Sequence, residues 1–370
     1  MIEKFESDAV VAAIADPAFE AIRDDLARLK KEPHQCPVYE SADEMLEEEK
    51  LSAVLVGTRC SLHSQMAIKV LSKDLPLYLE KPVATNRDDL QALSRAGRGR
   101  GSKVVVSFPL RVSPLVACVK EGLAAGKIGQ IEAVTAWCEP PYADVYFSRW
   151  YRDEAETGGL WLQKATHDFD YITHIVGAPA VRVASMNTRR VFKGERPAGL
   201  RCAECGEWEE CLESPFHRYH SRGESERVEG DSPRMCMFAQ DTGNEDSGHA
   251  LVEFENGVVA SYSQNFMVRR SAGRRGARLY GYRGTIEFDW YKDEVKVFYN
   301  QSPRVETHTI DSSAFSHAGG DGILIWNFLK VAAGEAESIS PLEAGLLSVN
   351  LCLAARESSE SGAFVNVEGL

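Results

Sequence analysis

Pro76-Leu77-Tyr78-Leu79-Glu80-Lys81-Pro82 is a short apolar run that ends at a charged pair and a proline. A run of this length bounded by prolines is typical of a buried strand in a parallel sheet. Pro82 ends the strand, because it has no N–H to donate and biases Lys81 toward an extended backbone. Lys81 is therefore predicted at the carboxyl end of a central strand, where open α/β sheets bind ligands. An isolated Glu80–Lys81 pair could equally be a surface ion pair, so the flanking sequence has to decide.

Short apolar strands alternate with helical patterns on both sides of this stretch. The predicted strands are residues 9–15, 53–56 and 104–106, and the predicted helices are residues 17–31, 62–72 and one that begins after Asn86 as its cap. Ser41-Ala42-Asp43-Glu44 indicates a capping box at the start of another short helix. This alternation indicates a Rossmann-like, doubly wound parallel sheet with right-handed crossovers.

Length and composition restrict the class of protein. The chain has 370 residues, which suggests two domains. Its formal net charge of -13 at pH 7 argues against nucleic acid or an anionic membrane as the main partner. It contains no apolar run of the ~18 residues that a spanning helix needs, and residues 1–7 lack the pattern of a signal peptide. We therefore expect a cytoplasmic protein that binds neither nucleic acid nor membrane.

The pattern changes after residue 110. A helix is predicted over residues 111–125 with Gly126 as its C-cap, and the alternating residues 130–137 begin a second domain. Glu255-Asn256-Gly257-Val258 is a strong hairpin signal. Further strands are predicted at residues 278–289, 294–299 and 364–367, and further helices at 322–333 and 340–358. The expected domains are residues 1–110 and 111–370, with an insertion at 200–246.

Asp16 after an apolar strand, Thr58 with His63 after the next strand, and then Glu80-Lys81-Pro82 make the chain resemble the Gfo/Idh/MocA oxidoreductases. Later motifs that fit are Arg111, residues 126–129, Gly158-Gly159, His167-Asp168-Phe169-Asp170 and Gly319-Gly320-Asp321. The resemblance implies an α/β plus α+β protein, in which a Rossmann-like domain precedes a large, mostly antiparallel sheet with helices on one face. It also implies hydride transfer between NAD and a sugar, cyclitol or related polyol.

Asp16 bears on the choice of cofactor. An acid at the end of such a strand can accept hydrogen bonds from ribose hydroxyls and would repel an extra phosphate, so we expect NAD rather than NADP. An Asp before a proline is also a common helix cap, and position alone leaves both interpretations open. The other cofactor-binding residues implied by the resemblance are Thr58, His63, Glu80, Lys81 and Pro82.

One element of the family pattern is absent from this sequence. Members begin with a strand and a Gly-x-Gly-x-x-Gly turn that cradles the pyrophosphate at a helix N-terminus, and no such segment precedes Val10. We expect a start that was assigned too late rather than a truncated, cofactor-deficient product, because the later site residues are present.

The catalytic residues are predicted on the helix that follows Gly158-Gly159. Regular helical spacing places Lys164, His167 and Tyr171 on one face. The resemblance assigns His167 to acid/base chemistry, and a histidine with a pKa near neutrality suits the removal of a hydroxyl proton. Lys81 would stabilise the developing alkoxide. The alternative is a structural histidine bonded to a backbone carbonyl.

Gln163 departs from the family pattern, because many sugar-alcohol dehydrogenases of the family carry an acid four residues before the histidine. A glutamine cannot tune the histidine as a carboxylate would, so the proton relay must differ. Lys164 could bind an anionic or polyhydroxylated substrate or act beside Lys81, and it could equally be a solvated helix lysine. Asp321 has a second interpretation as a helix N-cap. The predicted substrate-binding residues are Arg111, Gln163, Asp170, His317 and Asp321.

The insertion at residues 200–246 is polar and contains four cysteines, Cys202, Cys205, Cys211 and Cys236. Four thiolates that include a C-x2-C pair can hold a tetrahedral metal, which would order a segment with little apolar content. Zinc is the first choice and an iron–sulfur cluster the second, with His217 and His220 as spare ligands. The alternative is four free thiols in a reducing compartment.

The expected function is therefore NAD-dependent oxidation or reduction of a small carbohydrate or polyol by a homodimer or homotetramer. Two other functions stay open. The first is redox-assisted glycoside cleavage, in which a bound NAD is oxidised and restored in each cycle. The second is a non-catalytic ligand-binding regulator, which the missing glycine turn and Gln163 would favour.

Overall fold

The computed structural model describes residues 9–20, 36–214, 234–311 and 319–370, which form two compact units. The first unit contains the described residues up to Ser113 and those from Gly319 to Leu346. The second contains those from Pro114 to Asp311 and from Leu347 to Gly369. Among the described helices, none is both long enough and apolar enough to cross a membrane.

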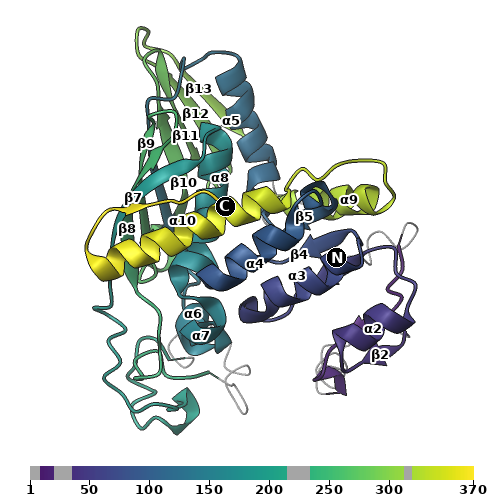
Figure 1. Cartoon of the computed structure of the whole chain (residues 1–370). Coiled ribbons are helices and arrows are strands. Elements are labelled where there is room, and N and C mark those ends of the chain that lie inside the picture. The colour runs from purple at the N-terminus through teal and green to yellow at the C-terminus, as the bar shows by residue number, and fades with distance from the viewer. Residues whose placement is uncertain (1–8, 21–35, 215–233, 312–318) are drawn as a thin grey trace. The chain divides into compact units, whose positions relative to one another are not determined.

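The first unit contains a three-stranded parallel sheet in the order β3-β4-β5. Figure 1 labels β4 and β5 of this sheet. Its strands are β3 Val54–Val56, β4 Leu77–Leu79 and β5 Val104–Val106, and Leu79 lies in register with Val56 and Val106. The helices of this unit are α2 Ala42–Glu48, α3 His63–Ser72, α4 Arg87–Gly97 and α9 Gly320–Ala332. The predicted parallel, Rossmann-like arrangement is confirmed, with β4 as the central strand of the three.

A separate parallel pair precedes this sheet in the chain. β1 Ile14–Ala15 pairs with β2 Val38–Tyr39, so the strand predicted over residues 9–15 is much shorter than expected. Most of the helix predicted at 17–31 lies outside the described residues. The predicted cap of α2 is confirmed, because the Asp43 N–H donates to the Ser41 hydroxyl oxygen at 3.2 Å.

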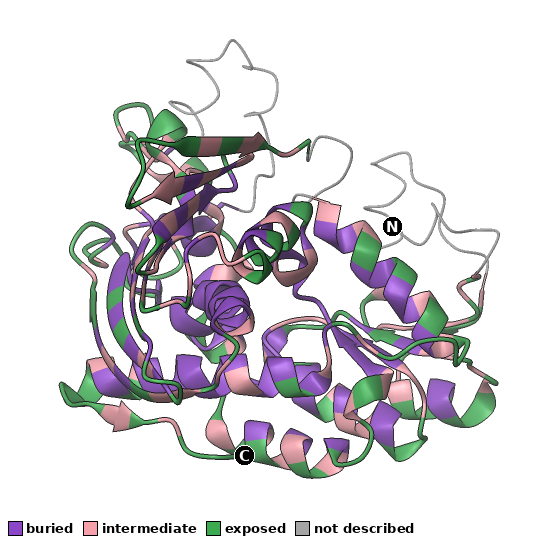
Figure 2. Ribbon diagram, turned by 90° about the horizontal axis from the view of Figure 1, so that it is seen from above, coloured by how far each residue is buried: buried purple, intermediate pink, exposed green. Residues whose placement is uncertain are grey.

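The second unit is built on a nine-stranded mixed sheet in the order β13-β12-β11-β10-β6-β9-β8-β7-β14. β6 and β9 are parallel and the other neighbouring pairs are antiparallel, so the expected, mostly antiparallel sheet is confirmed. Buried residues alternate with intermediate or exposed ones along strands such as β9. Figure 2 shows strand arrows on which buried and more exposed positions alternate. The strands are β6 Ala133–Glu139, β7 Ala180–Thr188, β8 Ser247–Phe254, β9 Val259–Asn265, β10 Arg274–Tyr280, β11 Gly284–Asp289, β12 Glu294–Tyr299, β13 Val305–Thr309 and β14 Val365–Asn366.

Helices and short helical turns accompany this sheet. The long helix α10 Leu342–Ser361 begins in the first unit and continues in the second, where the Ser185 hydroxyl of β7 bonds the Ala355 carbonyl oxygen. The other helices are α5 Pro114–Ala124, α6 Val145–Ser148, α7 Glu154–Thr157 and α8 Thr166–Val176. The 3-10 turns used below are η4 Pro109–Val112 and η5 Trp150–Arg152.

Two predicted helix starts are wrong for local reasons. The helix predicted from residue 111 begins at Pro114, after the η4 turn, because proline suits the first helical position. Asp321 is not the N-cap of α9, since Gly319 holds that place with a φ of +89° and Asp321 lies in the first turn. Gly320 packs against the Pro109 carbonyl so closely that a side chain could not enter there.

Candidate functional site

Lys81 lies directly beyond the carboxyl end of β4, where the sequence predicts a ligand-binding position. It is half-buried, and its backbone N–H donates to a carboxylate oxygen of Glu80 at 3.3 Å. The Lys81–Pro82 peptide bond is cis. The end of β4 therefore carries a lysine and a glutamate in adjacent positions.

His63 joins two loops at this edge of the sheet. Its Nδ1 lies 2.8 Å from the Pro82 carbonyl oxygen, and its Nε2 lies 3.0 Å from the Thr58 carbonyl oxygen. Burial is the main cause that lowers the pKa of His63, against the two carbonyl contacts, which raise it. Because each ring nitrogen faces a backbone carbonyl oxygen, His63 can act on a cofactor only indirectly, by holding the loops of Thr58 and Pro82 in place.

Asp16 shows the capping geometry that the sequence left open. The Ala18 N–H donates to Asp16 Oδ1 at 2.8 Å, and the Phe19 N–H donates to the Asp16 carbonyl oxygen at 3.2 Å. The carboxylate is half-buried and keeps its second oxygen, Oδ2, for another donor. Capping and ribose binding are therefore compatible at this residue, and ribose binding stays a prediction.

In the second unit, the predicted regular helix begins as a π-helix, η6 Trp161–Ala165, and becomes the α-helix α8 at Thr166. π-turns are rare and frequent at functional sites. The regular α-helix predicted through Lys164 is therefore wrong in its first turn, and the shared face of Lys164 and His167 stays a prediction. Both side chains are buried, with 4% and 7% of their surface exposed.

Lys164 is a buried cation held by two tyrosines. Its Nζ donates to the Tyr142 hydroxyl oxygen at 2.8 Å and lies 5.1 Å from the centre of that ring. The Tyr146 ring is 5.9 Å from the same nitrogen. The interpretation of Lys164 as a solvated helix lysine is therefore wrong.

The electrostatics of this pair lower the pKa of the tyrosine and raise the pKa of the lysine. Burial opposes ionisation of Tyr142, but the charges of Lys164 and Arg275 outweigh it and lower the pKa of the phenol. Burial and Arg275 lower the pKa of Lys164, while Tyr146 and Tyr142 raise it above its usual value. Tyr142 therefore loses its proton more readily than an ordinary tyrosine, while Lys164 holds its proton more firmly than an ordinary lysine.

Asp168 anchors α8 to β10 through a buried ion pair. Its two carboxylate oxygens accept from Arg275 Nε at 2.8 Å and Nη2 at 3.1 Å, and the Tyr262 hydroxyl donates to the same carboxylate at 3.1 Å. Asp168 has none of its surface exposed and Arg275 only 5%. Burial lowers the pKa of Arg275, but the charge and hydrogen bonds of Asp168, together with the neighbouring Cys138 and Tyr142, raise it well above its usual value.

Glu245 holds the start of the π-helix. Its Oε2 accepts from the Leu160 N–H at 3.2 Å, and its Oε1 accepts from the Gln264 side chain at 3.2 Å. Burial is the main cause that raises the pKa of Glu245 to about 7, with a smaller contribution from the charge of Glu154 and against backbone hydrogen bonds that lower it. Glu245 borders a cavity of about 140 Å³ that also contacts Gly159 and Arg356.

The four cysteines of the insertion line one small cavity of about 20 Å³. Burial and the neighbouring Cys236, Cys211 and Cys205 raise the pKa of the Cys202 thiol to about 11. In the described parts of the chain, however, no group of three or more His, Cys, Asp or Glu side chains is arranged to hold a metal ion. The structure thus gathers the thiols without showing the predicted metal centre, and His217 and His220 lie outside the described residues.

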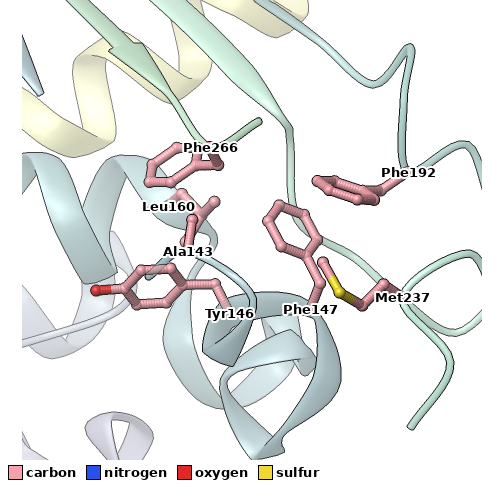
Figure 3. Packing of buried hydrophobic residues seen from close by; sticks show 7 residues of the cluster. All are labelled: Ala143, Tyr146, Phe147, Leu160, Phe192, Met237 and Phe266. Atoms are coloured by element: carbon pink, nitrogen blue, oxygen red, sulfur yellow. The ribbon is translucent and has the colours of Figure 1, made fainter. Parts of the chain in front are cut away.

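The insertion is docked on the segment that carries Tyr142. Arg234 pairs with Asp144 at 3.0 Å, and the Met235 N–H donates to the Ser148 carbonyl oxygen at 2.9 Å. Met237 joins a buried apolar cluster on the same segment (Figure 3). The members of this cluster are Ala143, Tyr146, Phe147, Leu160, Phe192, Met237 and Phe266. The cysteine cavity and the Tyr142–Lys164 pair are therefore parts of one packed structure.

The predicted substrate-binding residues fall in both units. Gln163 and Asp170 are buried in the second unit, on η6 and α8. Arg111 is half-buried on η4 and Asp321 is buried on α9, both in the first unit, while His317 lies outside the described residues. Their role in substrate binding stays a prediction.

Sequence reasoning missed Tyr142, Glu245 and Arg275. These residues contact the helix formed by η6 and α8, or the residue just before it, from other segments of the chain. A partial signal existed for Arg275, because strand alternation must turn one of the adjacent Arg274 and Arg275 toward the core. No local pattern distinguishes Tyr142 or Glu245 from other surface tyrosines and glutamates.

These features define a class of protein. The first unit has a parallel Rossmann-like sheet with a lysine at a strand end, and the second unit holds a histidine and a lysine–tyrosine pair. This combination is typical of a nucleotide-dependent oxidoreductase.

Comparison with known families makes the assignment specific. The NAD-binding Rossmann fold of the GFO_IDH_MocA oxidoreductase family matches residues 2–108, and the C-terminal alpha/beta domain of that family matches residues 120–367. The chain belongs to the Gfo/Idh/MocA oxidoreductase family and is an NAD-dependent oxidoreductase by fold. Nothing in these matches supports the predicted loss of an N-terminal strand and glycine-rich turn.

Individual relatives are distant. The Bacillus subtilis protein YteT is 26% identical over 318 residues, which cover 76% of this chain and 73% of that protein. The scyllo-inositol 2-dehydrogenase (NAD(+)) of the same species is 26% identical over 149 residues, 38% of this chain and 40% of that enzyme. A levoglucosan dehydrogenase solved with NADH and levoglucosan has a TM-score of 0.74 at 18% identity, covering 97% of this chain and 91% of that chain. This last likeness shows the fold alone.

Proposed function

We propose that this protein oxidises a hydroxyl group of a sugar, cyclitol or related polyol and delivers the hydride to NAD. The observation that carries the proposal is Lys81 at the carboxyl end of β4, within a family domain that binds NAD. Relatives with this family pattern are named for inositol substrates, in Bacillus subtilis and in Thermotoga maritima. They support a polyol as the substrate class without singling out one compound.

Each proposed catalytic residue has one task. The Lys81 ammonium would bind the substrate oxygen and stabilise the negative charge that develops on it. His167 would take the hydroxyl proton, which requires the neutral imidazole. Lys164 would hold the polar end of the pocket positively charged, since its nitrogen is buried against two tyrosine rings.

The strand ends of the first unit suit a dinucleotide chemically. The half-buried Asp16 carboxylate can accept from ribose hydroxyls, and the Thr58 hydroxyl is exposed after β3. NAD, when bound, accepts the hydride. Because the Asp16 charge would repel a 2′-phosphate, we expect NAD to be preferred over NADP, and Asp16→Ala should narrow that preference.

The direct test is turnover by the purified protein. NADH formation is measured with NAD and a panel of sugars, cyclitols and polyols, and we expect Lys81→Met to lower kcat by about 10²–10³-fold. Lys73→Met, which changes an exposed lysine at the end of α3, serves as the matched control. Absence of NADH formation with every compound, and of NADH consumption with the matching ketones, would refute the dehydrogenase. Sugar released from a glycoside without net NADH would instead support redox-assisted cleavage.

We also propose that Cys202, Cys205, Cys211 and Cys236 hold a structural metal, zinc before an iron–sulfur cluster. Support comes from their common cavity and from a polar segment that needs a cross-link to be ordered. Metal analysis of anaerobically purified protein should find about one equivalent of zinc. Cys205→Ser should lose the metal, whereas Cys118→Ser, outside the insertion, should keep it. Protein that contains neither zinc nor iron would rule the site out.

The homodimer or homotetramer predicted from the family is the remaining part of this proposal. Analytical ultracentrifugation of the purified chain would decide between these states, and a monomer at every concentration would contradict both.

A further inference from the structure

We propose that Tyr142 is a further catalytic residue, whose phenolic oxygen exchanges the proton of the substrate hydroxyl with the support of Lys164. The inference rests on the dehydrogenase function proposed above and deepens it by naming an acid/base group. It also offers an explanation for Gln163, which stands where many family members carry an acid that tunes the histidine. A tyrosine tuned by a buried lysine can supply the chemistry that a glutamine cannot.

Two tyrosines surround the Lys164 ammonium, and they differ in their access to solvent. Tyr142 accepts the 2.8 Å hydrogen bond from Lys164 and keeps 45% of its surface exposed. Tyr146 contacts the same cation through its ring and is only 8% exposed. Of these two, Tyr142 combines direct contact with a buried cation and a surface that a substrate can reach.

The groups that act on the Tyr142 hydroxyl come from several elements of the second unit. They are Lys164 on η6, Arg275 on β10, Cys138 on β6, Tyr146 on α6 and Tyr291 after β11. Burial raises the pKa of both Cys138 and Tyr146 to about 12, so neither carries a charge near neutrality. The two cations Lys164 and Arg275 remain, although Asp168 offsets Arg275, and they favour the phenolate of Tyr142.

The proposed step balances as a simple proton exchange. In the oxidation direction, the Tyr142 phenolate accepts the hydroxyl proton in place of the His167 imidazole considered above. The carbinol C–H leaves as a hydride to NAD, and the C–O bond becomes a carbonyl. Tyr142 is then a neutral phenol that keeps its hydrogen bond with Lys164. Because the ring is partly exposed, the proton can pass on to water and regenerate the phenolate.

Two measurements on the intact protein test this role. The first is the pH profile of kcat with a polyol substrate, for wild type, Tyr142→Phe and Lys164→Met. Tyr142→Phe should lower kcat by about 10²–10⁴-fold with little change in KM and should remove the rise of the rate with pH. Lys164→Met should move that rise to higher pH, because the phenolate loses its cation.

The second measurement is a phenolate absorbance titration, which needs no turnover. The chain has 12 tyrosines, so the signal of Tyr142 is taken as the difference between wild type and Tyr142→Phe. This difference should show a step below the ordinary tyrosine pKa of about 10, and Lys164→Met should raise it. Tyr282→Phe, at an 81% exposed position between β10 and β11, is the matched control for both measurements.

The outcomes separate this inference from the function on which it rests. If wild type forms NADH and Tyr142→Phe keeps the same kcat and pH profile, the Tyr142 role is refuted while the dehydrogenase stands. A difference titration with its midpoint at or above about 10 refutes it as well. If wild type turns over no polyol in either direction, the dehydrogenase proposal fails and the catalytic role of Tyr142 fails with it.

Discussion

Removal of the Arg275 charge should destabilise the second unit far more than removal of its neighbour's charge. Arg275→Met leaves the fully buried Asp168 carboxylate without its two hydrogen bonds at 2.8 and 3.1 Å, with the Tyr262 hydroxyl as its remaining donor. Breaking a buried ion pair from one side costs about 3–5 kcal/mol, since the abandoned charge cannot return to water. For a domain of this size, each kcal/mol corresponds to about 2–4 °C, so the loss should be on the order of 10 °C in Tm.

Arg274→Met is the matched control, one residue away on the same strand. Arg274 also forms a two-pronged pair, with Glu139 at 2.9 and 3.0 Å, but half of its side chain is exposed. Its loss should cost no more than about 1 kcal/mol. Thermal unfolding of both variants by circular dichroism makes the comparison. Equal shifts for the two variants would refute the reasoning that burial, and not the number of hydrogen bonds, sets the cost.

A further measurement distinguishes an abandoned charge from lost packing. The double variant Arg275→Met with Asp168→Leu removes both charges, and replacing a buried pair by apolar residues is often close to neutral. It should therefore be more stable than Arg275→Met alone. A double variant as unstable as the sum of the two single variants would show that the two charges do not interact, and would refute the explanation by an abandoned charge.

Three shorter predictions concern other sites. Gly276→Ala should abolish correct β10–β11 pairing, because a Cβ there would lie 1.9 Å from the Phe288 carbonyl oxygen, and soluble expression checks this. Asn86→Ala should cost about 1 kcal/mol in chemical denaturation, since the Asp89 N–H at 2.9 Å loses its cap. Burial raises the pKa of Glu245 to about 7, so the folded state holds this proton more firmly than the unfolded state does. The stability that comes from the bound proton is fully present below the unfolded pKa of about 4.5 and is lost as the pH rises through 7. Glu245→Gln should flatten the difference in Tm between about pH 5.5 and about pH 8.

Sequence patterns correctly predicted those helices and strands that depend on a few neighbouring residues. The apolar run of β4 and its terminating proline are contained in seven consecutive residues, and the Asn86 cap of α4 depends on one side chain and a nearby N–H. Lys81 was therefore placed at the strand end without knowledge of the remaining chain. The helix from Pro114 and the shortened β1 show the usual limit, because tertiary contacts decide where an element ends.

The helix formed by η6 and α8 could not be predicted in detail, because distant residues decide its form. Its first turn is tied to Glu245, 85 residues from Leu160, and its second turn to Arg275, 107 residues from Asp168. Regular spacing predicted an ordinary α-helix through Lys164 and His167, and the structure has a π-turn at Trp161–Ala165 instead. A sequence pattern with a period of 3.6 residues contains no information on such a tether.

The buried charges around this helix do not cancel. Lys164 and Arg275 bring two positive charges, and Asp168 offsets one of them through its paired oxygens. Among these three buried residues, one positive charge is left over, and a buried charge without a counterpart is costly. The phenolate of Tyr142, 2.8 Å from Lys164, is one group that can balance it, and an alkoxide developing on a substrate is another. The same excess positive charge that lowers the pKa of Tyr142 would therefore also stabilise negative charge on the substrate oxygen in the transition state of hydroxyl oxidation.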